Sequence, residues 1–338
     1  MRTERTIGTI RQVADATGVS VATVSRVVNG SGKVSAKTVE RVRQACLDLN
    51  YVPNSAAKAL TTKRSRTIGV IVPTLAHSIF ATFLGELEAV CSKLNYSVVI
   101  ALSGGNPEQE SRRAKELLAM GAEAFALIGA QRDPELIALL NLREVPFVRT
   151  SIWRTKDGIP TIGYDNEPLA KQAMEYLVAK GHRRVAVLHG PQHDNDRTRL
   201  RLRGISSFAH EHADLTITTH GGSLDEAGGV MALRDAMEQE HKPTAVLCLS
   251  DVLALGALFE APRLGLKIPA DLSIMGFDDL AWSSFTDPPL TTMALPTLKM
   301  GRLVANQLAA FLDDGEPLKS VCLNAQIIER KSVVAPSD

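Results

Sequence analysis

The sequence has few aromatic residues, no paired cysteines and no long apolar run. Aromatic side chains make up 4% of its 338 residues. The four cysteines lie far apart, which excludes a disulfide-stapled scaffold and indicates reduced thiols. No stretch approaches the roughly 18 apolar residues that identify a membrane helix, and residues 1–9 contain no apolar segment. We therefore expect neither a membrane span nor a signal peptide, and we expect a cytoplasmic location.

The charge of the chain is unevenly distributed. The formal net charge of +1 argues, taken alone, against a nucleic-acid partner. Residues 1–66, however, contain 12 of the 38 basic residues and 4 of the 37 acidic ones, a net charge of +8. The remaining chain contains 26 basic and 33 acidic residues, a net charge of −7. A small basic module joined to a larger acidic one indicates a polyanionic partner for the first module only.

Residues 1–50 have the pattern of a helix-turn-helix module. A short helix with Thr9 as its cap is followed by Gly18, which suits the positive φ of a tight turn. Ser20 caps a second helix over residues 21–28, and a third is expected over residues 35–49. Two short helices joined by a three-residue glycine turn are typical of DNA-binding modules whose second helix enters the major groove. An ordinary three-helix bundle is the alternative.

The rest of the chain alternates short β-branched runs with amphipathic stretches. This alternation predicts parallel sheets wound by right-handed crossovers, and the strands are too many for one doubly wound domain. We therefore expect two α/β lobes, with ligands bound between them beyond the carboxyl ends of the strands. The expected strands cover residues 68–72, 98–101, 124–128, 147–148, 185–188, 245–249 and 273–276. The expected helices cover residues 80–94, 107–120, 134–140, 169–180, 224–239 and 252–264.

Short segments along nearly the whole chain resemble the LacI/GalR family of repressors. In the basic module these are Gly18-Val-Ser, Thr23-Val-Ser-Arg-Val-Val-Asn and Tyr51-Val-Pro-Asn. Further along, in the family's order, stand Ile68-Gly-Val-Ile-Val-Pro, Gly181-His-Arg, Ser250-Asp, Gly276-Phe-Asp-Asp, Pro289-Leu-Thr-Thr and Glu329-Arg-Lys-Ser. Each segment by itself is a weak signal. So many segments in the family's order, across nearly the whole chain, are a specific signal.

The resemblance implies a complete domain organisation. It implies an all-α helix-turn-helix head over residues 1–50 and a hinge helix with linker over residues 51–66. The core is then of the periplasmic-binding-protein type I-like class, with two doubly wound parallel-sheet lobes. One lobe comprises residues 67–165 plus 297–323, and the other residues 166–296 plus 324–338. The chain is expected to cross between the lobes near residues 164–166, 293–297 and 322–325.

The resemblance also implies which residues contact DNA. Val21 and Ala22 stand where the family reads base edges, and as apolar residues they suit thymine methyl groups. Arg26 can donate to guanine, and Leu60 matches a hinge leucine that wedges into the minor groove. The set of expected DNA-binding residues is completed by Thr9, Ser20, Thr23, Ser25, Asn29 and Asn54, polar residues of which several suit phosphate contacts. Packing in the head or on a lobe is the alternative for Val21 and Leu60.

The expected partners are a palindromic operator, a small-molecule effector and a second copy of the chain. One head covers only half a site, so a palindrome requires a homodimer. The tail after Arg330 has no heptads, which argues against a coiled-coil tetramer. We expect a repressor, with an activator or a co-repressor-dependent regulator as the alternative. Whether the effector releases or strengthens DNA binding stays open.

Ten residues match the family's ligand positions in the cleft. Arg201 matches an arginine that holds hydroxyl or carboxylate groups, and Asp278 an acid that accepts from sugar hydroxyls. Arg197, outside the ten, adds positive charge to the cleft loops, so we favour an anionic effector such as a sugar acid or an organic acid. The alternative for Arg149 and Arg197 is an exposed position on the surface. This alternative applies least to Arg201. The ten residues are Leu75, His77, Phe80, Ser103, Arg149, Asp165, Arg201, Ser223, Ser250 and Asp278.

An enzyme is the competing class of protein, because Asp278 and Asp279 could pose as a pair of catalytic carboxylates. Adjacent residues on an extended segment point to opposite sides, so the two cannot act on one substrate atom. The sequence has no nucleophile elbow, phosphate loop or dinucleotide fingerprint, and its histidines lack zinc-ligand spacing. A pure solute-binding protein would need a signal peptide and no basic head. We therefore expect no catalytic residue, cofactor or metal.

Overall fold

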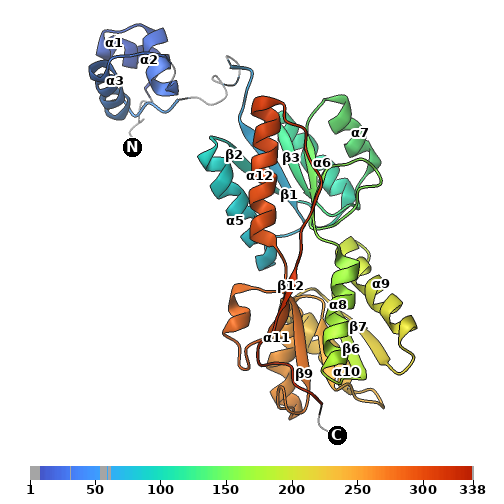
Figure 1. Cartoon of the computed structure of the whole chain (residues 1–338). Coiled ribbons are helices and arrows are strands. Elements are labelled where there is room, and N and C mark those ends of the chain that lie inside the picture. Colours follow the sequence, from blue (N-terminus) through green and yellow to red (C-terminus); the bar gives the residue numbers. More distant parts are fainter. Residues whose placement is uncertain (1–7, 31, 54–58, 60–61, 337–338) are drawn as a thin grey trace, which may run out of the picture. The chain divides into compact units, whose positions relative to one another are not determined.

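The computed structural model describes residues 8–30, 32–53, 59 and 62–336. The chain divides into two compact units, Met1–Ser65 and Arg66–Asp338, which we call the head and the core. Figure 1 shows the helical head and the two lobes of the core. The expected positions of Asn54 and Leu60 lie outside the described residues.

Within residues 8–53, apart from residue 31, the head forms three helices whose ends are set by local chemistry. Helix α1 (Ile10–Thr17) begins at Thr9, which forms a reciprocal capping box with Gln12, and ends at Gly18 with a φ of 63°. Helices α2 (Val21–Asn29) and α3 (Ala36–Asp48) begin at capping serines. Their common core consists of Val13, Ala14, Val24, Val27, Val42 and Ala45. The prediction of an all-α helix-turn-helix head is confirmed.

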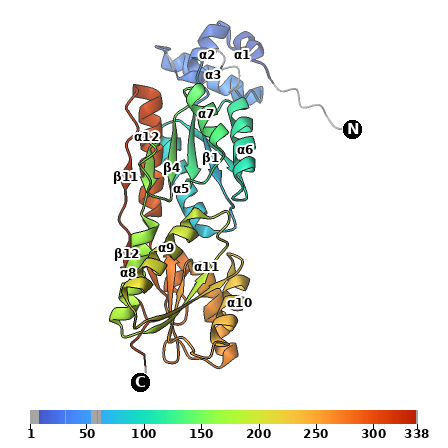
Figure 2. The ribbon, with the colours of Figure 1, turned by 90° about the vertical axis from the view of Figure 1, so that its right-hand side faces the viewer.

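Lobe 1 of the core contains a six-stranded sheet with the order β11-β5-β4-β3-β1-β2, and its paired strands are all parallel. Apolar side chains of α5 and α12 cover one face of this sheet, and those of α6 and α7 cover the other. Figure 2 shows this layering from the side. The strands are β1 (Thr67–Val72), β2 (Ser97–Leu102), β3 (Ala124–Ile128), β4 (Phe147–Thr150), β5 (Thr161–Gly163) and β11 (Val321–Cys322). The helices are α5 (Ser78–Lys93), α6 (Pro107–Ala119), α7 (Pro134–Leu142) and α12 (Thr297–Asp314).

Lobe 2 contains a second six-stranded sheet, with the order β12-β10-β9-β8-β6-β7. Only β12 runs antiparallel to its neighbour. Helices α8 and α9 cover one face, and α10 and α11 cover the other. The strands are β6 (Arg184–His189), β7 (Thr216–Gly221), β8 (Ala245–Cys248), β9 (Ser273–Asp278), β10 (Thr291–Ala294) and β12 (Gln326–Ile328). The helices are α8 (Asn166–Ala179), α9 (Asp196–Glu211), α10 (Glu226–Met237) and α11 (Asp251–Glu260), with 3₁₀ turns η1 (Ala261–Leu264) and η2 (Ala281–Ser284).

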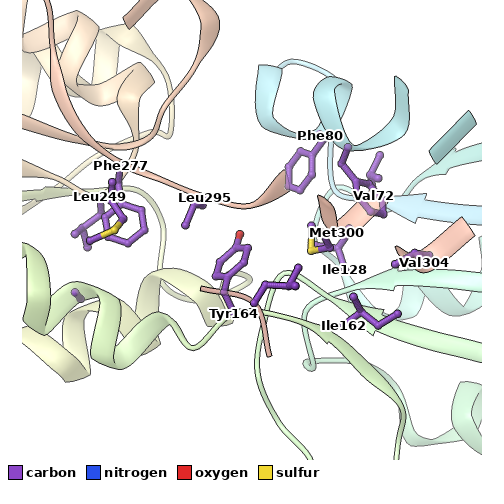
Figure 3. Close-up of a cluster of buried hydrophobic side chains, with 14 of the residues drawn as sticks. Val72, Phe80, Ile128, Ile162, Tyr164, Leu249, Phe277, Leu295, Met300 and Val304 are labelled. Carbon is purple, nitrogen blue, oxygen red and sulfur yellow. The ribbon is translucent and has the colours of Figure 1, made fainter. Parts of the chain in front are cut away.

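The two lobes share one continuous apolar cluster. The chain passes between the sheets from β5 to α8, from β10 to α12 and from β11 to β12. Tyr164 and Leu295 lie on the first two of these segments and are both buried in the cluster, which continues to Val72 in lobe 1 and Phe277 in lobe 2 (Figure 3). The prediction of an α/β core with two parallel-sheet lobes is confirmed.

The structure contains several elements that were not predicted from the sequence. The edge strand β7 reads Thr-Ile-Thr-Thr-His-Gly, and its half-exposed pattern lacks the apolar run of a buried strand. Helix α9 has a polar, arginine-rich sequence. Helix α12 was also not predicted, although it buries Met300, Val304 and Leu308 at helical spacing, a signal that the sequence did contain.

A buried carboxylate organises the carboxyl edge of the lobe 2 sheet. Asp251, the first residue of α11, is fully buried. It accepts hydrogen bonds from Ser283 Oγ at 2.6 Å, Thr292 Oγ1 at 2.6 Å and the Leu280 N–H at 2.9 Å. The loop after β9 and the strand β10 are therefore tied to one helix end. Gly276 faces this carboxylate so closely that a Cβ atom would collide with it.

We predict that Asp251→Ala destabilises the core by about 3 kcal/mol, because three buried donors lose their acceptor. Urea unfolding followed by circular dichroism measures the change. Glu175→Ala, on the exposed face of α8, serves as the control and should stay within about 0.5 kcal/mol of the wild type. Equal stabilities of Asp251→Ala and the control would contradict the structural role of Asp251.

Candidate functional site

A cavity of about 280 Å³ lies between the two lobes. It is bordered by the segments that follow β1, β2, β5, β6, β8 and β9, which is where ligands bind in open parallel sheets. Lobe 1 and the first crossing contribute Pro73, Thr74, His77, Ile79, Phe80, Gly104, Gly105, Ser151 and Tyr164. Lobe 2 contributes Pro191, Asp194, Asn195, Arg197, Thr198, Arg201, Leu224, Leu249, Ser250 and Asp278.

Half of the ten residues expected at a ligand site line this cavity. They are His77, Phe80, Arg201, Ser250 and Asp278. His77 precedes the first residue of α5 and stacks on Phe80, with 6.2 Å between the ring centroids. One edge of the cavity is therefore aromatic and comes from lobe 1, and the opposite edge is charged and comes from lobe 2.

Arg149 does not line the cavity, contrary to expectation. Its side chain is only 1% exposed, and its Nη2 donates to Asp157 Oδ2 at 2.7 Å. Arg149 lies on the same face of β4 as Phe147, which packs under α6 and α7, so its side chain points into that layer. Burial lowers the pKa of Arg149, and the hydrogen bond to Asp157 opposes this shift. The guanidinium is thus part of the structure of lobe 1.

Four other expected residues also lie outside the cavity lining. Leu75 is 49% exposed, and Ser103 lines a separate space of about 20 Å³. Asp165 caps α8 by accepting from the Glu167 N–H at 3.3 Å. Ser223 is exposed, and its hydroxyl donates to Asp225, which caps α10. The side chains of Asp165 and Ser223 thus take part in forming helix ends.

Arg201 is held in a fixed orientation at the centre of the charged edge. Its Nε donates to Asn166 Oδ1 at 3.0 Å, and its Nη1 donates to the Leu249 carbonyl at 2.6 Å. The guanidinium carbon lies 3.9 Å from the centroid of the Phe277 ring, a cation–π contact. Burial lowers the pKa of Arg201, while the nearby Asp278 carboxylate raises it. The result is a preorganised donor at the edge of the cavity.

Asp278 lies next to Arg201 and has an unusual backbone. Its φ is 134° and that of Asp279 is 56°, conformations that non-glycine residues seldom adopt and that cluster at functional sites. Ser250 Oγ donates to Asp278 Oδ2 at 2.8 Å, and Arg201 Nη1 lies 3.9 Å from Asp278 Oδ1. Asp279 instead accepts from Arg330 at 2.7 Å, so the two carboxylates face different partners. Burial raises the pKa of Asp278 to about 7 against the opposing effect of Arg201.

Several lining residues from loops and from the beginning of α9 were not predicted from the sequence. Tyr164 follows β5, Leu249 follows β8, and Asn195 and Thr198 stand at the beginning of α9. The signal for the first two is their position at the carboxyl end of a strand. Asn195 and Thr198 had no such signal, because helix α9 was itself not predicted.

The lobes are joined beside the cavity by the beginning of α9. Asp196 in lobe 2 accepts hydrogen bonds from the N–H groups of Ala130 at 2.5 Å and Gln131 at 3.2 Å in lobe 1. Arg199 donates to the Gln131 side chain at 2.7 Å. The structure therefore describes a core in which both lobes touch across one edge of the cleft.

Two buried histidines of the core have structural partners. His182 is hydrogen-bonded to Thr244 and to the Val334 carbonyl, and His220 to Asp235. Among the residues placed by the structure, no group of three histidine, cysteine or acidic side chains could hold a metal ion. Of the helices in the described ranges, none is long and apolar enough to cross a membrane.

The second helix of the head presents its start to solvent. Val21 is 41% exposed, and Ala22 and Arg26 are also exposed, whereas Val24 and Val27 face the core of the head. The apolar character of Val21 is therefore not used for packing within the head.

Among the described polar residues expected at DNA, most lie along this helix. Ser20 and Thr23 pair through their hydroxyls at 2.9 Å, and Asn29 donates to Ser25 at 3.1 Å. Thr9 caps α1. All of them except Thr9 belong to α2 or to its cap.

A helix-turn-helix head and a two-lobed core with a cavity define a DNA-binding regulator with a ligand-sensing module. Comparisons with known proteins agree with this class. Residues 9–54 match the family described as bacterial regulatory proteins, lacI family. Residues 174–333 match a periplasmic binding protein-like domain.

Individual relatives match over nearly the full length. The ribose operon repressor of Haemophilus influenzae is 30% identical over 97% of this chain and 99% of that protein. The transcriptional repressor CytR of Escherichia coli is 33% identical over 88% of each chain. The lac repressor dimer bound to operator and the anti-inducer ONPF is 31% identical, with a TM-score of 0.85 over 97% of this chain and 99% of that chain. This chain belongs to the lacI family, whose members are DNA-binding transcriptional regulators and not enzymes.

We predict that the contribution of Asp278 to stability depends on pH. Because its pKa is raised from 3.8 to about 7, the folded state retains a proton that the unfolded state releases. This contribution is complete below about pH 4 and is lost as the pH rises through about 7. The stability of the wild type relative to Asp278→Asn should therefore fall between about pH 4 and pH 7 in urea unfolding and level off at higher pH. Parallel pH profiles of the two proteins would contradict the raised pKa.

Proposed function

We propose that this protein is a homodimeric repressor, acting in the cytoplasm, that binds a palindromic operator under the control of a small hydroxylated effector in the inter-lobe cavity. The observation that carries the effector assignment is the adjacent placement of the Arg201 donor and the Asp278 acceptor at the cavity edge. A hydroxyl group both donates and accepts hydrogen bonds, so it can satisfy both side chains at once.

The exposed start of α2 supports direct reading of DNA bases. Val21 and Ala22 can contact thymine methyl groups in a major groove, and Arg26 can donate to guanine O6 and N7. Thr9, Ser20, Thr23, Ser25 and Asn29 supply short polar side chains suited to phosphate contacts. Asn54 and Leu60 stay proposals from the family resemblance alone.

An exposed apolar surface on lobe 2 supports dimerisation. Phe285 is 86% exposed and Phe259 is 59% exposed, and both border a groove with Leu255 and Trp282. Two neighbouring exposed phenylalanines are costly to leave in water and typical of a protein interface. The lac repressor structure, similar over nearly the whole chain, is described as a dimer bound to operator.

The charge of the cavity favours a neutral effector over the anionic one expected from the sequence. Arg197 donates to Asp196 at 2.9 Å, and Arg201 lies near the carboxylate of Asp278. The Arg149 side chain points away from the cavity and pairs with Asp157. The positive charge expected of the cleft is therefore largely balanced. A sugar acid or an organic acid remains the second candidate, because Arg197 and Arg201 both line the cavity.

We predict salt-sensitive binding to a palindromic duplex, because the basic head displaces counterions from the DNA phosphates. The duplex is selected in vitro from random sequence, and its affinity is compared with that of a single half-site by fluorescence anisotropy. The wild type should prefer the palindrome by at least about tenfold, and Phe285→Asp should remove this preference by preventing dimerisation. Absence of salt-dependent DNA binding by the wild type would refute the proposed function.

We predict that Arg26→Ala loses discrimination for guanine at one position in each half-site, by about 1–3 kcal/mol. Arg41→Ala, an exposed arginine of α3, is the matched control. It should change affinity for all sequences alike and leave discrimination intact. Competition with duplexes substituted at each position measures both effects. Equal loss of affinity for all sequences by Arg26→Ala would assign Arg26 to the phosphates instead.

We predict that neutral sugars bind more tightly than the matching acids at pH 8, where the ionised Asp278 repels a carboxylate. Calorimetric titration compares ribose with ribonate and glucose with gluconate. Arg201→Ala should abolish binding of the tighter ligand, whereas Arg143→Ala, exposed after α7, should not affect it. Tighter binding of either acid would support the second candidate instead.

A further inference from the structure

The first residue of the core has a strained backbone. Arg66 precedes β1 and has a φ of 53°, in the left-handed region that favours glycine. Such a conformation costs free energy in a non-glycine residue and persists only where the surroundings hold it in place. Arg66 is also the point at which the segment from the head enters the core. The contacts of Arg66 therefore hold the chain at the boundary of the core.

Four residues from separate parts of lobe 1 hold Arg66. Its N–H donates to Glu123 Oε1 at 3.0 Å, and its guanidinium donates to the Leu94 carbonyl at 3.2 Å and to Asp313 Oδ1 at 3.0 Å. The guanidinium also lies 4.9 Å from the centroid of the Tyr96 ring. Tyr96 in turn donates its hydroxyl to Asp313 at 2.9 Å. We call these five residues the Arg66 clamp.

Two of the partners are the ends of long helices. Leu94 is the C-terminal cap of α5, and Asp313 lies in the last turn of α12. The backbone N–H and two guanidinium nitrogens of Arg66 thus bind parts of the chain that come together only in the folded lobe. Backbone and side chain of Arg66 are therefore both held by independent partners.

The same two helices begin beside the cavity. His77, Ile79 and Phe80, at the beginning of α5, line it. At the beginning of α12, Met300 Sδ accepts a hydrogen bond from the N–H of Ser151, another lining residue, at 3.3 Å. The clamp therefore holds the ends of α5 and α12 that are remote from the cavity.

The two helices pack against each other over their length. Arg302 of α12 donates to Glu86 of α5 at 2.8 Å, and a Cβ atom at Gly301 would lie 2.7 Å from the Phe83 carbonyl. Figure 1 shows α5 and α12 side by side in lobe 1. Such close packing makes the pair a firm support for the clamp.

We propose that Arg66 is a positioning residue for DNA binding. The clamp fixes the direction in which the chain leaves lobe 1 toward the head. In a dimer, two such fixed segments restrict the separation at which the heads can reach two half-sites. The proposal rests on the proposed function, because it assumes a dimer on a palindrome.

Fixed linkers and free linkers should differ in how strongly the affinity for a palindrome depends on the spacing of its half-sites. When the linkers are fixed, the second head binds at a high effective concentration only if the half-site spacing matches. When they are free, the effective concentration is lower and the spacing matters less. Binding of a single half-site uses one head and is the same in both cases.

The test uses full-length variants and the palindrome selected by the wild type. Arg66→Asn removes the guanidinium but keeps a residue that tolerates a positive φ, and Asp313→Ala removes one anchor without touching the linker. Arg113→Ala, which breaks the similarly exposed Arg113–Glu116 pair on α6, is the matched control. Each protein is titrated with the palindrome, with a single half-site and with palindromes carrying two extra central base pairs.

For Arg66→Asn and Asp313→Ala we expect at least a tenfold loss on the palindrome and less than a twofold change on the half-site. Both variants should also discriminate less than the wild type against the lengthened palindrome. Arg113→Ala should behave as the wild type, and circular dichroism should show all proteins folded.

Two outcomes would overturn the positioning role. In one, both clamp variants bind and discriminate as the wild type does. In the other, they lose affinity for the half-site as strongly as for the palindrome. A wild type that shows no preference for its palindrome would instead contradict the proposed function, so the two failures are distinguishable.

Discussion

The cost of burying the guanidinium of Arg201 is the constraint on which the rest of the proposed ligand site depends. A buried cation is tolerated only with hydrogen bonds and a nearby negative charge. Asn166 and the Leu249 carbonyl supply the hydrogen bonds, the Phe277 ring lies against the cation, and Asp278 supplies the charge. These partners come from the start of α8 and from the ends of β8 and β9. The geometry of the cavity edge thus follows from satisfying one side chain.

Helix α9 also connects the proposed ligand site to the contact between the lobes. Helix α9 presents Arg201 to the cavity and, at its first residue, bonds Asp196 to lobe 1. A ligand that contacts Arg201 therefore contacts an element that already joins the lobes. A ligand shifts such an equilibrium only through different affinities for the joined and separated states. In lobe 1, α5 and α12 run from the same cavity to Arg66, where the chain from the head enters the core.

The accuracy of prediction differed between local and long-range features. The head was predicted in detail, because caps such as Thr9 and turns such as Gly18 are determined by neighbouring residues. The apolar buried strands of both lobes were also recognisable, since parallel strands covered on both faces are continuously apolar. The short, threonine-containing β5 and β10 are buried too, but they were not predicted. The error at Arg149 has a different origin. Its side-chain direction depends on the face of β4 that it occupies and on Asp157 in the following loop.

The sequence by itself determined the class of the protein, its helix-turn-helix head, its two-lobed core and the strand ends that border the cavity. These features depend on residue spacing and on chemistry within a few positions along the chain. Only the tertiary structure decided which charged residues meet. It separated Arg149 from the cavity, placed Arg201 beside Asp278, and brought Arg66 to Asp313, which is 247 positions away. Charge pairing depends on distances in space, and those distances exist only once both sheets and their helices have packed.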